Sequence, residues 1–319
     1  MTTMLINLIG EQPAPNLLPV YELRPDKTLL VATERTKSVA ERLAQHLREK
    51  GYPTEIMLGE AYDIETTIHS IQQALKAEKA TRLVGNFTGG TKVMVLALLR
   101  VFQQWPYDDK QLVYFRTEGS QGVLYFFDPD SLSDREVRPL KKTLTLEDYL
   151  QIYLGDYRFE GPGPGPGHAF EVAVAEALSP VVDELYQGLR KGGALDIDFV
   201  FRCGNQIGIA EVKSGGKARS KEGIDQLNTA GGRDFLGTYV KKFLIVDTSW
   251  EELTNLKELA AARNIVLIEL PSFGQTGSLD LTDKQKLENI VNSKLLCGEL
   301  THAHPQLRPP PDRRTPGAD

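Results

Sequence analysis

Hydrophobic positions in the first half of the chain alternate between short apolar runs and helical stripes. The runs predict strands at residues 4–9, 28–32, 55–58, 82–87, 112–116 and 123–127. Helical stripes between them cover residues 36–50 and 64–75, and residues 91–104 are apolar nearly all round, which predicts a buried helix. Strands that alternate with helices predict an α/β unit with a doubly wound, Rossmann-like parallel sheet, whose last two strands read as a hairpin.

The second half begins after a break in this pattern. Residues 161–167 read Gly-Pro-Gly-Pro-Gly-Pro-Gly, from which no core can form. We therefore expect one domain at 1–157, a linker at 158–167, a second domain at 168–275, and a C-terminal segment at 276–319 with a helix and a disordered, proline-rich tail. The second domain reads as α+β, with helices at 168–178, 222–230 and 252–263, strands at 195–201, 207–213, 243–247 and 266–270, and a further helix at 283–296.

Composition narrows the class of protein. A chain of 319 residues suggests two domains, and it contains no apolar run long enough for a bilayer, so we expect no membrane partner. The two cysteines, Cys203 and Cys297, lie far apart, which fits a reducing cytoplasm and excludes a disulfide scaffold. The net charge of -6 argues against a protein that coats nucleic acid, but residues 199–242 carry eight basic and four acidic side chains. A nucleic acid, if bound, is expected there.

The strands at 195–201 and 207–213 bring charged residues together. A two-residue turn at Gly204-Asn205 would place Asp198 opposite Glu211, with their carboxylates about 5 Å apart on one face. Two such carboxylates repel each other unless a cation lies between them, and Mg²⁺ or Mn²⁺ would serve. Lys213 shares this face. The alternative is a solvated hairpin face with an ion pair between Lys213 and Asp196, which the same register places opposite.

With these residues the hairpin resembles the core of the PD-(D/E)XK nucleases, a restriction-endonuclease-like fold. Asp198 followed by Glu211-Val212-Lys213 matches the motif, although the proline that usually precedes the first Asp is absent. Glu171 on the preceding helix matches the family's acidic helix residue, and Gln226 matches a glutamine of the following helix. The resemblance implies that Asp198 and Glu211 hold the metal and that all five residues belong to the catalytic site. For Glu171 and Gln226 an ordinary exposed helix residue is the alternative.

A second candidate site lies in the first domain, where a strand ends at Phe87 and Thr88-Gly89-Gly90-Thr91-Lys92 opens a helix. Glycines let the backbone approach a ligand, and the free N–H groups of a helix start suit an anion. The spacing is neither a Walker A loop nor GxGxxG, so ATP hydrolysis and dinucleotide redox chemistry lose support. The loops at residues 10–16 and 33–37 lie at the same expected sheet edge.

In this context the stretch from Asn86 to Lys92 resembles the ligand loop of the CARF domain, which senses cyclic oligoadenylates in type III CRISPR immunity, and the Gly10–Asn16 loop sits where that family has another ligand loop. The residues that the resemblance places at the ligand are Gln12, Thr33, Lys37, Asn86, Thr88, Gly89, Gly90, Thr91 and Lys92. A CARF domain joined to PD-(D/E)XK is similar to the CRISPR ancillary nucleases. That similarity implies a homodimer with cyclic tetra-adenylate as activator.

The expected function is a cyclic tetra-adenylate-activated, metal-dependent endonuclease that cuts DNA and/or RNA in the cytoplasm. One hypothesis is that the linker and a flexible basic loop after Lys213 keep the enzyme inactive without ligand. Two alternatives stay open. The chain could be a cyclic-nucleotide-sensing regulator or binding module with an inactive nuclease domain, or a ring nuclease that degrades its own ligand. The residues do not decide between DNA and RNA, between single-strand cleavage and duplex nicking, or the ring size of the activator.

Overall fold

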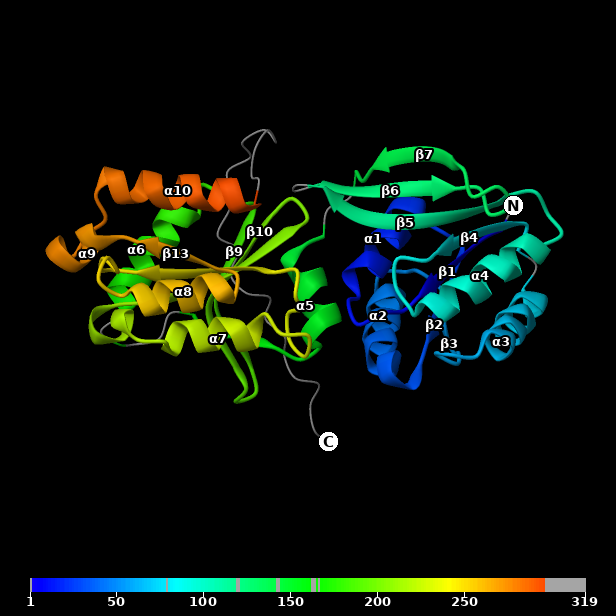
Figure 1. Cartoon of the computed structure of the whole chain (residues 1–319), viewed down its shortest axis with the longest axis horizontal. Helices are drawn as coiled ribbons and strands as arrows, with labels where there is room; N and C mark the ends of the chain where they lie inside the picture. Colours follow the sequence, from blue (N-terminus) through cyan, green and yellow to red (C-terminus); the bar gives the residue numbers. More distant parts are fainter. Residues whose placement is uncertain are drawn as a thin grey trace. The chain divides into compact units, whose positions relative to one another are not determined.

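The computed structural model describes residues 2–78, 80–118, 121–141, 144–161, 165 and 167–295. The chain divides into two compact units, Met1–Gly155 and Asp156–Asp319 (Figure 1). The boundary lies two residues before the expected end of the first domain. The chain is therefore a mixed α/β protein with one sheet in each unit.

The sheet of the first unit has the strand order β3-β2-β1-β4-β5-β6-β7. The first five of these strands in that order run parallel, and β6 and β7 continue the sheet antiparallel. The strands are β1 Thr3–Leu8, β2 Lys27–Ala32, β3 Thr54–Leu58, β4 Arg82–Asn86, β5 Lys110–Glu118, β6 Gln121–Phe127 and β7 Asp134–Pro139. The parallel part and the β5–β6 hairpin agree with the prediction from sequence, while β7 was not predicted.

The helices of the first unit include two that the sequence pattern did not reveal, α1 and α5. Two prolines disguise α1: one opens the helix and Pro19 lies inside it. In α5 the residues are buried on every side, so the helix shows no polar stripe. The helices are α1 Ala14–Leu23, η1 Glu34–Thr36, α2 Lys37–Glu49, α3 Ile64–Ala77, α4 Lys92–Gln104 and α5 Leu146–Leu154. The expected burial of α4 holds for one side only, because Leu96 on the other side is 54% exposed.

A buried ionic cluster joins α5 to α2. Asp148 Oδ1 lies 3.1 Å from His46 Nε2 and 3.1 Å from Lys50 Nζ, and its own helix start is capped by Thr145. Burial alone would raise the pKa of Asp148, but the contacts from His46, Thr145 and Lys50 hold it well below its usual range. The carboxylate therefore stays ionised inside the unit and fixes α5 against the rest of it.

The order of the parallel strands positions the candidate ligand site of the first unit. From β1 the chain continues to β2 on one side, whereas β4 pairs with β1 on the other side. The side on which the chain adds its next strands therefore changes between β1 and β4. Ligands of such parallel sheets bind at the carboxyl ends of the strands, next to this switch point. The loops that follow β1, β2 and β4 all leave the sheet at that edge.

The second unit has a six-stranded sheet in the order β13-β12-β11-β10-β9-β8. Strands β8 to β11 are antiparallel neighbours, and β11 to β13 are parallel. The strands are β8 Arg158–Phe159, β9 Glu184–Lys191, β10 Leu195–Cys203, β11 Gln206–Lys213, β12 Lys241–Val246 and β13 Ile265–Glu269. The helices are α6 His168–Leu178, η2 Gly215–Arg219, α7 Glu222–Ala230, α8 Thr254–Ala262, α9 Pro271–Thr276 and α10 Leu281–Leu295.

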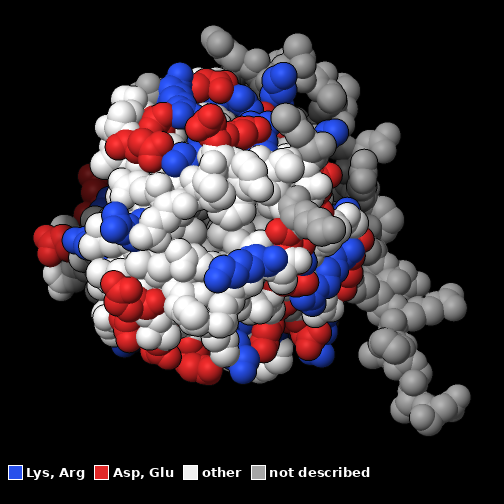
Figure 2. Space-filling model, turned by 90° about the vertical axis from the view of Figure 1, so that its right-hand side faces the viewer, with Lys and Arg blue, Asp and Glu red and all other residues white. Residues whose placement is uncertain are grey.

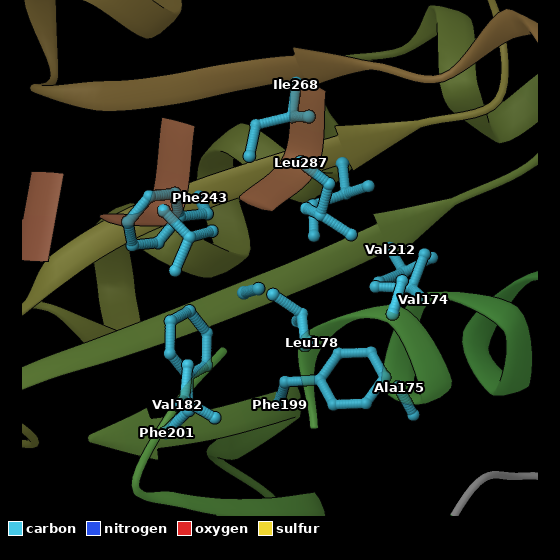
Figure 3. Close-up of a cluster of buried hydrophobic side chains, with 14 of the residues drawn as sticks. Val174, Ala175, Leu178, Val182, Phe199, Phe201, Val212, Phe243, Ile268 and Leu287 are labelled. Atoms are coloured by element: carbon cyan, nitrogen blue, oxygen red, sulfur yellow. The ribbon is translucent and has the colours of Figure 1, made fainter. Parts of the chain in front are cut away.

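The core of this unit lies on one face of the sheet, between the strands and helices α6 and α10. Aromatic side chains of β10 and β12 fill its centre, with Phe201 and Phe243 in tilted contact at 5.5 Å between ring centroids (Figure 3). Helix α10 contributes Leu287, Val291 and Leu295 to the same core. The second domain therefore extends beyond the expected end at residue 275, since α10 closes its core.

The predicted linker is partly a strand. Its first residues, Arg158–Phe159, form β8 and pair with β9. The chain then runs so close to β9 that a Cβ on Gly188 would lie 2.4 Å from the carbonyl oxygen of Gly161. Most of the Gly-Pro run, residues 162–164 and 166, lies outside the described residues, as do all residues from 296 onward, which include the predicted tail.

Cys203, at the end of β10, is buried. The other cysteine, Cys297, lies outside the described residues, so what the two distant cysteines indicate about the compartment stays a prediction.

Candidate functional site

The site in the second unit begins where β10 and β11 separate. The turn at Gly204-Asn205 and the pairing of Cys203 with Gln206 are as predicted, but the recorded ladder stops at Phe199 opposite Ala210. Beyond that point the carboxylate of Asp198 takes over the place of a backbone acceptor, and its Oδ2 accepts the Val212 N–H at 2.7 Å. The two strands therefore form a fork, with Asp198 at its opening.

Glu211 and Lys213 lie inside this fork. Glu211 is fully buried and Lys213 is 9% exposed, so the charged face is not the solvated hairpin face of the alternative interpretation. The Lys213 ammonium forms a close ion pair with Glu211 Oε2 and lies 3.7 Å from Asp198 Oδ2. Lys213 thus bridges the two carboxylates that the register argument brought together.

The ion pair between Asp196 and Lys213, which belonged to the alternative interpretation, is wrong. Asp196 instead lies 3.2 Å from Arg190 Nη2 on β9. The reason is the fork: the ladder between β10 and β11 ends before Asp196, whereas β10 and β9 remain paired at Asp196 and Arg190. Asp196 is therefore held on the β9 side of the strand.

Burial governs the electrostatics of the fork. Burial raises the pKa of Glu211 well above its usual range, and the charge of Asp198 raises it further, while Lys213 opposes both. Burial alone would lower the pKa of Lys213, but the charges of Glu211 and Asp198 outweigh it, so the net pKa lies above its ordinary value. Burial, followed by the charge of Asp198, also raises the pKa of Glu171. Glu171 on α6 therefore shares the electrostatic field of the fork.

Helix α7 packs against β10 and β11 over the charged face. Gly223 permits the approach, since a Cβ there would lie 2.6 Å from Leu244 Cδ1 and 3.4 Å from Lys213 Cγ. Gln226, three residues further along, has a buried side-chain oxygen without a hydrogen-bond partner. The structure thus places α7 over Lys213, and it leaves the Gln226 acceptor available.

The residues present fit a divalent cation, by their chemistry. Glu211 Oε1 is buried and accepts no hydrogen bond, and Gln226 Oε1 is likewise buried without a hydrogen-bond partner. Carboxylate and amide oxygens of this kind are the hard donors that Mg²⁺ and Mn²⁺ prefer. Within the described ranges, no group of three or more His, Cys, Asp or Glu is arranged to hold a metal ion. A cation in the fork would therefore rely on Asp198 and Glu211 with amide oxygens or water.

The basic segment after Lys213 is not the flexible loop that the sequence suggested. Gly215–Arg219 forms the 3-10 helix η2, and the backbone N–H of Gly215 donates to both carboxylate oxygens of Asp247, at 3.2 and 3.0 Å. The buried Trp250 donates its indole N–H to Ala218 O at 2.6 Å. These contacts fix the segment directly beside the fork, so no loop closure is needed to place it.

In the first unit, two loops pack backbone to backbone at the switch point. A Cβ on Gly89 would lie 2.3 Å from Leu8 O and 2.7 Å from Gly10 N, so only glycine fits. Gly90 has a φ of 77°, which also favours glycine. Helix α4 begins at Lys92, with Thr91 as its N-cap. The structure therefore joins the two glycine loops that the sequence singled out.

Buried asparagines support this loop. Asn86 is fully buried, and its side-chain N–H₂ donates to Asn7 Oδ1 at 2.8 Å and to Pro15 O at 3.0 Å. Its Oδ1 accepts the Thr88 hydroxyl at 2.6 Å, and Thr88 Oγ1 in turn accepts the Phe115 N–H at 2.7 Å. Asn86 and Thr88 therefore position the loop. Asn7 is a residue that sequence reasoning missed, although an asparagine inside a buried strand was the available signal.

The remaining predicted ligand residues lie at the same edge. Lys92 opens α4 and Lys37 opens α2; both are exposed, and neither has an ion-pair partner in the part of the chain that the structure describes. Thr33 precedes η1 and bonds to Thr36, while Gln12 accepts the Tyr153 hydroxyl at 2.9 Å. The edge thus offers two free cations at helix starts, the arrangement that suits an anion.

Residues 4–149 match the family model of the Card1 CARF domain. No curated protein matches the chain. Within the described ranges, no helix has the length and apolar character needed to span a bilayer.

The fold of the whole chain is shared with solved structures. Can2 from Sulfobacillus thermosulfidooxidans, solved with cyclic tetra-adenylate, is similar with a TM-score of 0.69 and 15% identity, over 92% of this chain and 99% of that one. Protein VC1899 from Vibrio cholerae is similar with a TM-score of 0.69 and 14% identity, over 93% and 99%. A type III CRISPR defence DNA nuclease activated by cyclic oligoadenylate is similar with a TM-score of 0.57 and 17% identity, over 95% of this chain and 46% of that one.

Residues 4–149 are thus similar to the CARF domain of the Card1 type, in a chain whose fold is similar to those of Can2 and of a type III CRISPR defence nuclease.

Proposed function

We propose that this protein is a metal-dependent endonuclease of type III CRISPR defence that cyclic tetra-adenylate activates and that cuts DNA and/or RNA. The observation that carries the proposal is the buried fork of the second unit, in which Lys213 bridges Asp198 and Glu211. Burial of the Glu211–Lys213 ion pair costs several kcal/mol of desolvation, so a purely structural reason for it is weak. Its position in a chain with a CARF domain supports a nuclease under nucleotide control.

In this proposal each residue of the fork has a role. Asp198 and Glu211 would hold Mg²⁺ or Mn²⁺, which supplies a water of lowered pKa and polarises the scissile phosphate. Lys213 stabilises the negative charge that develops on the phosphate oxygens. Glu171 and Gln226 complete the polar surroundings from α6 and α7. The cations Lys217, Arg219, Lys221 and Arg233 would contact the nucleic-acid backbone.

In the sensor, Lys37 and Lys92 bind the phosphates of the ligand, and the Gly89-Gly90 backbone lets it approach the sheet edge. Thr33, Thr91 and Gln12 line the same edge, while Asn86 and Thr88 hold the loop in shape. We propose a homodimer that surrounds one two-fold symmetric ligand. Figure 2 shows one face of the molecule, on which uncharged residues form a broad area with charged side chains within and around it.

The close Lys213–Glu211 ion pair favours one alternative. A lysine that neutralises the carboxylate could leave no room for a metal, and the second unit would then be an inactive nuclease fold in a cyclic-nucleotide-sensing regulator. Metal binding to Glu211 requires that this ion pair opens. Cleavage in the presence of metal and activator separates the two functions directly.

The experiment is a cleavage assay on RNA, single-stranded DNA and supercoiled plasmid, with Mg²⁺ or Mn²⁺ and with or without cyclic tetra-adenylate. We expect cleavage only when metal and activator are both present. Glu211→Gln should abolish it, whereas Glu222→Gln, a surface residue that pairs with Lys217, should not. Cutting by Glu211→Gln at the wild-type rate would refute the site. Absence of cutting by wild-type protein that binds the activator would favour the regulator, and linear products from the activator would indicate a ring nuclease.

A further inference from the structure

Tyr62 is the most exposed large hydrophobic residue in the part of the chain that the structure describes, with 85% of its surface accessible. It lies in the segment of residues 59–63 that connects β3 to α3. Tyrosine gains free energy when its ring is covered, so an open ring beside a candidate ligand loop is available to a ligand.

The segment crosses the carboxyl edge of the sheet toward the ligand loop. A Cβ on Gly59 would lie 3.3 Å from Val31 Cγ1 of β2, and two residues later the Ala61 carbonyl accepts the Thr91 hydroxyl at 2.6 Å. Tyr62 follows Ala61 directly. Tyr62 is therefore the direct neighbour in sequence of a residue, Ala61, whose carbonyl is bonded to the N-cap residue of α4.

Hydrogen bonds on both sides hold the segment in place. The Glu60 carbonyl accepts the Thr67 hydroxyl at 2.9 Å, and Asp63 accepts the Thr66 N–H at 3.0 Å as the N-cap of α3. The exposed ring is thus displayed from a fixed backbone, which reduces the entropy lost on binding.

The charges of the segment decide which part of a nucleotide it suits. Glu60 and Asp63 flank Tyr62 and are both exposed, and the backbone hydrogen bond from Thr66 lowers the pKa of Asp63. Two carboxylates repel a phosphate, whereas the free cations Lys37 and Lys92 attract it. The tyrosine segment therefore suits an uncharged base, for which an aromatic ring provides a stacking surface.

We propose that Tyr62 stacks on a purine base of the cyclic oligonucleotide bound at the β1–β4 edge, and so determines affinity for the base rather than for the phosphates. This inference rests on the proposed sensor function. The segment of residues 59–63 would then extend the ligand site beyond the glycine loops, because the hydrogen bond between Thr91 and Ala61 links the segment to them.

The test is the binding of cyclic tetra-adenylate, followed by calorimetry, to wild type and to Tyr62→Ala, Tyr62→Leu and Tyr62→Phe. Loss of one base–aromatic stack should raise the dissociation constant at least about 5-fold and up to about 150-fold for alanine. Phenylalanine keeps the stacking surface and should bind within about 2-fold of wild type, whereas leucine keeps only the apolar bulk and should resemble alanine. Tyr107→Ala is the matched control, since Tyr107 is 53% exposed and precedes β5 at the opposite, amino edge of the parallel strands.

The outcomes separate this inference from the function on which it rests. If wild type binds no cyclic tetra-adenylate, the sensor proposal fails. If wild type binds and Tyr62→Ala binds equally well, the stacking proposal alone fails. It also fails if Tyr62→Phe loses as much affinity as Tyr62→Ala, which would assign the effect to the hydroxyl. It fails as well if size-exclusion chromatography shows that Tyr62→Ala has lost a dimer that wild type and Tyr107→Ala retain, because the ring would then act in the dimer contact.

Discussion

Replacement of Lys213 by methionine tests whether the fork is a buried charge cluster. Methionine is unbranched and nearly isosteric, so the change removes the ammonium while it keeps most of the packing. Glu211 is fully buried, and its Oε1 already lacks a partner. Without Lys213 two neighbouring carboxylates would remain with no cation between them.

Removal of one partner from a buried ion pair typically costs about 3–5 kcal/mol of unfolding free energy. For a domain of this size that corresponds to a fall in Tm of about 6–20 °C. We expect this loss for Lys213→Met in the presence of EDTA. Lys217→Met is the control, because Lys217 pairs with Glu222 at 3.2 Å while its side chain is 69% exposed, and exposed pairs contribute about 0–1 kcal/mol.

The loss should also depend on pH. The folded pKa of Glu211 is raised, so the folded chain binds that proton more tightly, and stability falls as pH rises from the unfolded value of about 4.3 through the folded one. Lys213 opposes this shift, and its removal must increase it. The deficit of Lys213→Met should therefore be larger at pH 8 than at pH 5.

The chain offers a local reporter for this measurement. Its two tryptophans lie in different units, and Trp250 is fully buried beside η2, which follows Lys213. In a Trp105→Phe background, urea unfolding followed by fluorescence reports the second unit alone. Equal stability of Lys213→Met and Lys217→Met at pH 8, or a deficit that grows at pH 5, would refute the assignment of a buried ionic triad.

Three further substitutions test the fold around the sites. Gly89→Ala would place a Cβ 2.3 Å from Leu8 O, so we expect about 1–3 kcal/mol of destabilisation and loss of cyclic tetra-adenylate binding, measured by melting and calorimetry. Asp148→Asn should lower the free energy of unfolding by about 3 kcal/mol at pH 7. The lowered pKa of Asp148 confers stability that is lost as pH falls below about 3.9. Between pH 5 and pH 2 the Tm of the variant should therefore fall less than that of wild type. Gly188→Ala meets both a φ of 66° and the Gly161 carbonyl, and a urea midpoint unchanged from wild type would contradict that close contact.

The sequence predicted those elements whose signal is local. The turn at Gly204-Asn205 determined the register from Cys203 back to Phe199, since a two-residue turn leaves no freedom in pairing. The parallel strands of the first unit were also predicted, because buried runs alternate with amphipathic stripes. Elements without either signal were missed: α1 is interrupted by Pro19, and α5 has no polar face.

What the sequence could not reveal depends on long-range geometry. The pairing of β10 and β11 predicts that Asp196 faces Lys213 only if the ladder continues, and nothing local shows that it stops at Phe199. The anchoring of η2 depends on Trp250, which follows Lys213 by many residues and reads as an ordinary core residue. Similarly, the contact between Thr91 and Ala61 joins segments whose proximity follows only from the strand order.

The fork has a consequence for how inactive variants of this protein should be made. The Asp198 carboxylate is the acceptor of the Val212 N–H, which the end of the ladder would otherwise leave without a partner. Alanine at Asp198 would remove a catalytic group and also break a backbone hydrogen bond beside Glu211, so its phenotype would combine two losses. Asparagine keeps an oxygen for that N–H while it removes the charge. Asp198→Asn therefore measures the contribution of the carboxylate to activity without loss of the backbone hydrogen bond. An alanine variant would overstate that contribution.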